Sequence, residues 1–244
     1  MTGVRYPIVE LRQYGLHPGR RDDLIGLFER ELIEPQEAAG MALVGQFRDL
    51  DDPDRFVWLR GFPDMQTRAE ALGRFYYGPV WKEHGAEANA TMIDSDNVLL
   101  LRPVNMHSGF PAPVGARPPA GHLTPPPSLV TATLCYRDSP FDQAFTAFFT
   151  SHVAPVMSQT GAAPLACLQT EHAENTFPAL PVRTGENVFA WFSRFADLPG
   201  LTAHREALAR CSHWHATVRP GLLAMLAGEP QQLTLAPTPR SLLR

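Results

Sequence analysis

Polar side chains of complementary chemistry recur at alternate positions near the start of the chain. Glu10, Arg12 and Tyr14 have the spacing i, i+2, i+4, which places them on one face of a β-strand. The other face carries Val9 and Leu11, which we expect to meet helices, so the polar triplet is predicted to point into the interior of a barrel formed by the sheet. A carboxylate, a permanent cation and a phenol there could bind a small anion or polarise a carbonyl group. The alternative is a self-satisfied network that only fills the interior.

A second group of side chains with binding chemistry follows further along the chain. Trp58 and Arg60 are two residues apart on a predicted strand, so they share a face. Trp81 and His84 share a helical face at i, i+3, and His84 could act as a general base near neutral pH. Core packing of the tryptophans and a surface position for His84 are the alternatives. The candidate ligand-binding residues are therefore Glu10, Arg12, Tyr14, Arg48, Trp58, Arg60, Trp81 and His84. No catalytic residue is assigned.

Metal and cofactor motifs are not found in the sequence. The three cysteines, Cys135, Cys167 and Cys211, show no CxxC spacing, which argues against a zinc site or a disulfide framework. His213 and His215 would lie on different faces of a helix and chelate together only on a strand. Glycine-rich phosphate loops and nucleophile elbows are also lacking. We therefore expect neither a metal nor a cofactor.

Composition narrows the class of protein and of partner. The chain has 244 residues, 44% of them hydrophobic, enough for one large core or two small ones. Its net charge of −4 argues against nucleic acid and anionic membranes as main partners. No apolar run approaches the roughly 20 residues that span a bilayer. The strand-like pattern that starts near Ile8 leaves no room for a targeting peptide, so we expect a cytoplasmic protein.

The chain contains an internal duplication. Five residues recur at a constant offset of 133 positions (189 − 56). The pairs are Phe56 and Phe189, Trp58 and Trp191, Phe62 and Phe195, Asp64 and Asp197, and Trp81 and Trp214. Upstream, the offset is 121 (130 − 9), as for Val9 and Val130. The second copy therefore carries an insertion of 12 residues (133 − 121), which we place within 170–185.

Periodicity within the first copy predicts the order β-α-β-β-α-β, a ferredoxin-like unit. Asp64 is a plausible N-cap for the helix that contains Arg68 to Phe75. The predicted organisation is a first unit over 1–104, a proline- and glycine-rich linker over 105–128, a divergent second unit over 129–236 and a tail over 237–244. Two such sheets can close face to face, so we predict an α+β protein in which the tandem units form one intrachain barrel.

The first copy resembles a known family. The segments VELRQYGLHPG at 9–19, GMALVGQF at 40–47 and FVWLRGFPDMQTRAEALGRFYYGPVWKEH from Phe56 resemble the bacterial NIPSNAP family of the dimeric α+β barrel superfamily. The second copy keeps the aromatic landmarks but loses the E-x-R-x-Y strand and the G-P-V-W-K-E-H segment. The family has no defined molecular function, and related barrels include cofactor-free monooxygenases and isomerases.

Two functional hypotheses remain open at this point. The first is a binding or scaffold protein whose barrel holds a small, anionic ligand. The second is a cofactor-independent monooxygenase or isomerase that acts on a small carbonyl or phenolic metabolite. A buried acid or base without a partner would favour the second hypothesis. The second copy has the uncharged Thr131 and Thr133 where the first has Glu10 and Arg12. We therefore expect the ligand site in the first copy. A homo-oligomer is compatible with either hypothesis.

Overall fold

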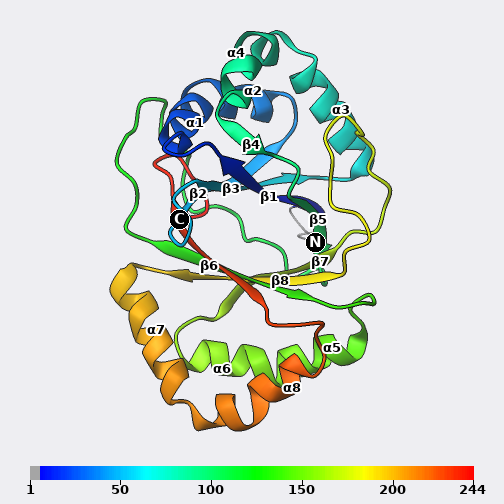
Figure 1. The fold of residues 1–244 in the computed structure, drawn as a ribbon, viewed down its shortest axis with the longest axis vertical. Coiled ribbons are helices and arrows are strands. Elements are labelled where there is room, and N and C mark those ends of the chain that lie inside the picture. Colours follow the sequence, from blue (N-terminus) through cyan, green and yellow to red (C-terminus); the bar gives the residue numbers. More distant parts are fainter. Residues whose placement is uncertain (1–5) are drawn as a thin grey trace.

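The computed structural model describes residues 6–244, which form two successive units of like topology (Figure 1). The strands of the first unit are β1 (Ile8–Leu16), β2 (Ala42–Asp49), β3 (Arg55–Phe62), the short β4 (Met92–Asp94) and β5 (Val98–Pro103). Its helices are α1 (Arg21–Leu27), the π-helical turn η1 (Phe28–Leu32), α2 (Ile33–Ala38), α3 (Met65–Tyr76) and α4 (Pro79–Asn89). Asp64 caps α3 by accepting a hydrogen bond from the backbone N–H of Thr67, which confirms the predicted N-cap.

The second unit repeats this pattern without the short fourth strand. Its strands are β6 (Leu129–Tyr136), β7 (Pro164–Thr170), β8 (Val188–Phe195) and β9 (Gln231–Pro237). Its helical segments are α5 (Gln143–Phe148), η2 (Phe149–Val153), α6 (Ala154–Gln159), α7 (Leu198–Arg210), η3 (Trp214–Val218) and α8 (Arg219–Leu223). Asp197 caps α7 as Asp64 caps α3, so the duplicated Asp has the same role in both units.

Eight antiparallel strands close into one barrel, as the duplication predicts. The order is β3-β2-β9-β6-β8-β7-β5-β1, and β1 pairs again with β3 to complete the circle. The two units join through the pairs β2–β9 and β5–β7. Closure leaves none of these eight strands with a free edge, which protects the sheet from further pairing.

The barrel interior is an apolar core to which both units contribute. It contains Val9, Leu11, Val57 and Leu59 from the first unit, together with equivalents such as Val130 and Ala132 from the second. Phe47 and Phe192 are fully buried there. The interior is therefore packed with side chains at the level of these residues and is a hydrophobic core.

Helices cover the outside of the barrel on two opposite sides, α1 to α4 over the first unit and α5 to α8 over the second (Figure 1). Each layer buries its own apolar cluster against the sheet, around Phe28, Trp58 and Phe75 in one case and around Phe149 and Trp191 in the other. Most of each barrel strand is thus buried, between the apolar core inside the barrel and the helices outside it.

Three segments outside the regular elements tie the units together. The loop between β7 and β8, residues 171–187, is called the covering loop here; it lies in the region of the predicted insertion and reaches the first unit, where Thr176 donates a hydrogen bond to the carbonyl of Met65. Between the units, the Arg117 guanidinium donates to the carbonyls of Leu43 and Arg240. Beyond β9, Arg240 is buried and donates to the carbonyl of Pro118. Among the described residues, no helix is long and apolar enough to cross a membrane.

Candidate functional site

The polar triplet of β1 faces the helices and not the barrel interior. Tyr14 belongs to the cluster that packs under the first helix layer, whereas Val9 and Leu11 belong to the barrel core. The expectation that Val9 and Leu11 meet the helices was therefore wrong. The space that holds Glu10 and Arg12 lies between the sheet and the helices of the first unit.

Glu10 is the centre of a buried ionic cluster. Its Oε2 accepts hydrogen bonds from Arg12 Nη1 at 2.6 Å and from Arg60 Nε at 2.7 Å. Its Oε1 accepts one from Arg68 Nε at 2.6 Å. The strand register explains this geometry, since Glu10 on β1 lies directly opposite Arg60 on β3. All four side chains are 0–1% exposed, so the cluster is shielded from bulk solvent.

Aromatic rings line the cluster. The Arg12 Nε donates to the hydroxyl of Tyr14 at 2.8 Å, and the Arg60 Nη1 donates to the hydroxyl of Tyr76 at 3.3 Å. The Arg12 and Arg60 guanidinium carbons lie 5.5 and 5.0 Å from the ring centroid of Trp58, within the range of cation–π attraction. Trp58 therefore contacts both of the guanidinium groups that bind Glu10 Oε2.

The covering loop closes the cluster from outside. The Arg68 Nη1 donates to Asn175 Oδ1 at 3.0 Å and to Thr176 Oγ1 at 3.3 Å. Phe177 of the same loop is buried against Tyr76 and Tyr77, with centroid distances of 6.2 and 5.6 Å. A segment of the second unit thus completes the surroundings of a charge cluster built by the first.

Electrostatics keep Glu10 ionised. Burial alone would raise the pKa of Glu10, but the guanidinium groups of Arg60, Arg12 and Arg68 outweigh it and hold that pKa well below its usual range. Burial raises the pKa of Tyr14, with Arg12 opposing the shift. One carboxylate then faces three guanidinium groups, so the charges of the cluster do not cancel.

The remaining predicted residues lie at the edge of this cluster or away from it. Trp81 packs against Tyr76, with ring centroids 4.8 Å apart, and so touches its outer edge. His84 is partly exposed, with its Nε2 3.9 Å from a Glu31 oxygen. Arg48 forms an ion pair with Asp22 at 2.9 Å. The structure thus brings together five of the eight candidates, namely Glu10, Arg12, Tyr14, Trp58 and Arg60.

Sequence reasoning missed Arg68, Tyr76 and the covering loop as parts of the site. Arg68 stands within the predicted helical run, where an arginine is ordinarily exposed, yet it is fully buried. A signal was present, because the second copy has Leu201 where the first has Arg68, and a position that is apolar in one copy is a candidate for burial in both.

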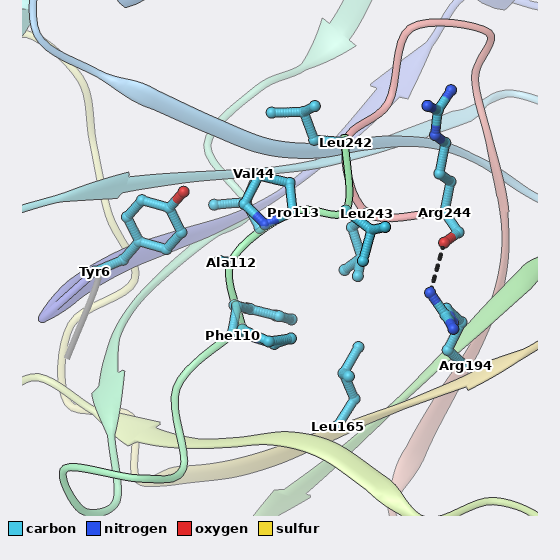
Figure 2. A pocket seen from close by; sticks show the side chains of 12 residues that line it. Tyr6, Val44, Phe110, Ala112, Pro113, Leu165, Arg194, Leu242, Leu243 and Arg244 are labelled. Atoms are coloured by element: carbon cyan, nitrogen blue, oxygen red, sulfur yellow. Dashed lines mark hydrogen bonds between the residues drawn. The ribbon is translucent and has the colours of Figure 1, made fainter. Parts of the chain in front are cut away.

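Cavities lie at several other places. One of about 340 Å³ opens at an end of the barrel and is lined mainly by apolar side chains, including Val44, Phe110, Leu165 and Leu243 (Figure 2). Arg194 stands at its side and donates a hydrogen bond to the carbonyl of Arg244 at 3.0 Å. A second, of about 360 Å³, lies under the covering loop, and a third, of about 210 Å³, lies in the second unit. No group of three or more His, Cys, Asp or Glu residues suited to a metal ion occurs within residues 6–244.

Comparisons with known proteins agree with this architecture. Residues 9–107 match the family model described as NIPSNAP. No curated protein matches the chain. A candidate monooxygenase from Fusobacterium nucleatum subsp. nucleatum has a TM-score of 0.56 at 11% identity, covering 98% of this chain and 94% of that one. An anthrone oxidase-like protein has a TM-score of 0.56 at 13% identity, and the match covers 97% of this chain and 94% of that protein. A NIPSNAP-like domain protein from Burkholderia xenovorans is 27% identical and has a TM-score of 0.39, and the match covers 46% of this chain and 95% of that protein.

These matches divide between the parts of the chain. The family model ends near the close of the first unit, so it describes that unit alone. The two full-length structural matches extend over both units and, at their low identity, show the fold alone. The first unit is therefore similar to the NIPSNAP family, and together with the second unit it has the fold of an α+β barrel within one chain.

Proposed function

We propose that this protein binds a small anionic molecule at the arginine cluster of its first unit, as a NIPSNAP-like binding or scaffold protein. The observation that carries the proposal is the excess of buried cations, three guanidinium groups around one carboxylate. Buried charges are costly unless they are paired. A carboxylate or phosphate group would match both the charge and the planar N–H donors of arginine.

Unused donors support the same ligand class. Among the described residues, Arg60 Nη2, Arg68 Nη2 and the indole Nε1 of Trp58 are buried without a hydrogen-bond partner. A buried donor left unpaired costs about 1–3 kcal/mol, and more when it is charged. An anion that accepts from these donors would remove that cost, so part of the stability of the complex would come from the protein's own unsatisfied groups.

Space for a ligand adjoins the cluster under the covering loop. The cavity of about 360 Å³ is lined by Leu100 and Asn175. Leu100 is the β5 partner of Glu10, and Asn175 accepts from Arg68. An anion that enters there and displaces the Asn175 and Thr176 side chains would reach Arg68 first. We therefore propose the covering loop as the access route.

The protonation states favour binding over catalysis. Glu10 is held ionised by three cations, and the raised pKa of Tyr14 keeps its phenol protonated at neutral pH. Neither group exchanges a proton readily near pH 7, which a general acid or base must do. The alternative, a cofactor-independent monooxygenase or isomerase, would need such a group, so these residues support the binding hypothesis better.

Stabilisation by anions tests the proposal. We expect inorganic phosphate, and a small dicarboxylate such as succinate, to raise the melting temperature of the protein at constant ionic strength. Saturating a single site at one hundred times its Kd adds about 2.7 kcal/mol of stability. In Arg68→Leu, which carries the residue of the second unit at this position, the response should fall at least tenfold in apparent affinity. Thermal melts over an anion titration, with chloride as the reference salt, measure both effects.

Arg30→Leu is the matched control, because Arg30 is 60% exposed and, among the residues that the structure describes, is paired only with Glu31. Its anion response should equal that of the unmodified protein. An equal response in Arg68→Leu and the unmodified protein would place the anion on the surface and contradict the proposal. So would the lack of any response beyond that of chloride.

A further inference from the structure

The second unit contains a cavity at the position that the ionic cluster fills in the first unit. The correspondence is residue by residue, because the sheet registers agree: Glu10 lies opposite Arg60, and Thr131 lies opposite Ser193. At offset 133, Leu201 on α7 stands where Arg68 stands on α3. Each long ionic side chain of the cluster is thus replaced by a shorter, uncharged one.

The result is a cavity of about 210 Å³ between the sheet and the helices of the second unit. Thr131, Thr133, Ser193 and Leu201 all line it. The duplication therefore supplies an internal comparison, in which one fold position is filled with charge in one copy and open in the other. Protein interiors are otherwise close-packed, so an opening of this size needs an explanation.

We propose that this cavity binds a neutral, monocyclic aromatic molecule that carries a hydroxyl or carbonyl oxygen. The size fits, since a cavity of roughly 150 Å³ is known to hold benzene in an engineered protein core. Trp191 and Trp214 both line the cavity and offer ring faces and edges to an aromatic ligand. The site is independent of the anion site proposed for the first unit.

Hydrogen-bonding groups in the cavity explain the oxygen atom. The hydroxyl groups of Thr131 and Thr133 have no hydrogen-bond partner among the described residues, although Thr133 is buried. By contrast, the Ser193 hydroxyl already donates to the carbonyl of Ala162 at 2.7 Å. Either threonine can therefore donate to, or accept from, an oxygen of a ligand.

Neutrality follows from the charges that line the cavity. Its buried lining residues, which include Thr133, Trp191, Ser193 and Leu233, carry no charge. Arg205 is exposed and donates to the hydroxyl of Thr234 at 2.9 Å, and Arg219 is paired with Glu229 at 2.6 Å. Burial lowers the pKa of His204, so its ring is uncharged at neutral pH. A charged ligand would lose its hydration and find no ionic partner among the buried lining residues, with only the exposed guanidinium of Arg205 left to an anion.

The test uses the full chain with phenol, benzyl alcohol and benzamide as probes, measured by calorimetry and by ligand-observed NMR. We expect saturable binding with one site per chain. Leu208 lines the cavity, and the equivalent residue of the first unit is Phe75. Leu208→Phe therefore puts a larger side chain into the cavity and should weaken binding at least tenfold. Thr133→Val keeps the shape and removes the hydroxyl, so it should weaken the oxygen-bearing probes several-fold and leave toluene unchanged.

Leu198→Phe is the control, because Leu198 lies on the same helix and is 57% exposed; its binding should be unchanged. Thermal melts establish whether each variant is folded. If Leu208→Phe does not fold, the binding measurements on Thr133→Val alone test the proposal. The proposal is overturned if no probe binds saturably, if both cavity variants bind as the unmodified protein does, or if benzoate binds as tightly as benzamide. Added phosphate should leave probe binding unchanged, which separates this site from the anion site.

Discussion

Glu10→Gln should destabilise the protein by roughly 3–5 kcal/mol, the range measured when one partner of a buried ion pair is removed. The substitution keeps the shape of the side chain but leaves Arg12, Arg60 and Arg68 close together without a counter-charge. Like charges in a dry site repel strongly because little water screens them. Urea unfolding, followed by circular dichroism, measures the loss as a lower midpoint at an unchanged slope.

The effect of Glu10→Gln should depend on pH in a defined direction. The pKa of Glu10 in the folded protein lies below its unfolded value of about 4.3, so its stabilisation is complete above that value and is lost as pH falls towards the folded pKa. The difference in unfolding free energy between the two proteins should therefore stay constant from neutral pH to about pH 5 and shrink below about pH 4.

Glu70→Gln provides the control, since Glu70 is 52% exposed and its contact with Arg74 is 3.8 Å long. Its expected cost is below about 0.5 kcal/mol. Arg68→Leu gives a second comparison, because it removes one cation from a cluster that has more cations than anions. It should therefore lower the free energy of unfolding far less than Glu10→Gln does. Equal losses for these three variants would mean that the charge balance of the cluster does not matter for stability.

The overall fold was accessible from the sequence because the chain contains its own comparison. Landmarks such as Trp58 and Trp191 established the repeat, and the repeat required two sheets with matching bare faces. The insertion was also detectable, because the offset is 121 at Val130 and 133 at Phe189, and the covering loop lies in that interval. What the offset could not reveal is that this loop lies over the other unit, because a contact between distant segments leaves no local pattern.

The site was only partly predictable, and the orientation of β1 shows why. Strand alternation separates two faces but does not say which face points inward when both are buried. Polar residues were assigned to the barrel interior, whereas two facing sheets leave room there for shorter apolar chains such as Val9 and Leu11. The copies held a usable signal, because these two positions remain apolar as Val130 and Ala132, whereas Glu10 and Arg12 do not remain charged.

Phe47→Ala tests this reversed orientation, and we expect it to cost roughly 3–5 kcal/mol. Phe47 is fully buried in the barrel core, to which side chains of both units contribute. Removing its ring leaves a void lined by residues of both sheets, and the closed strand circle limits how far they can collapse into it. Because the core is common to the two units, both should unfold together at a lower urea concentration, in one transition by circular dichroism and tryptophan fluorescence.

Leu198→Ala serves as the reference, because the Leu198 side chain is 57% exposed. This substitution should lower the free energy of unfolding by less than about 0.5 kcal/mol. Phe47→Leu, which keeps most of the volume, should fall between the two variants. If the barrel interior were a ligand site, Phe47→Ala would enlarge an existing space at little cost and would alter the anion response. A loss of several kcal/mol with the anion response unchanged would instead assign the interior to stability and the space beneath the helices to binding.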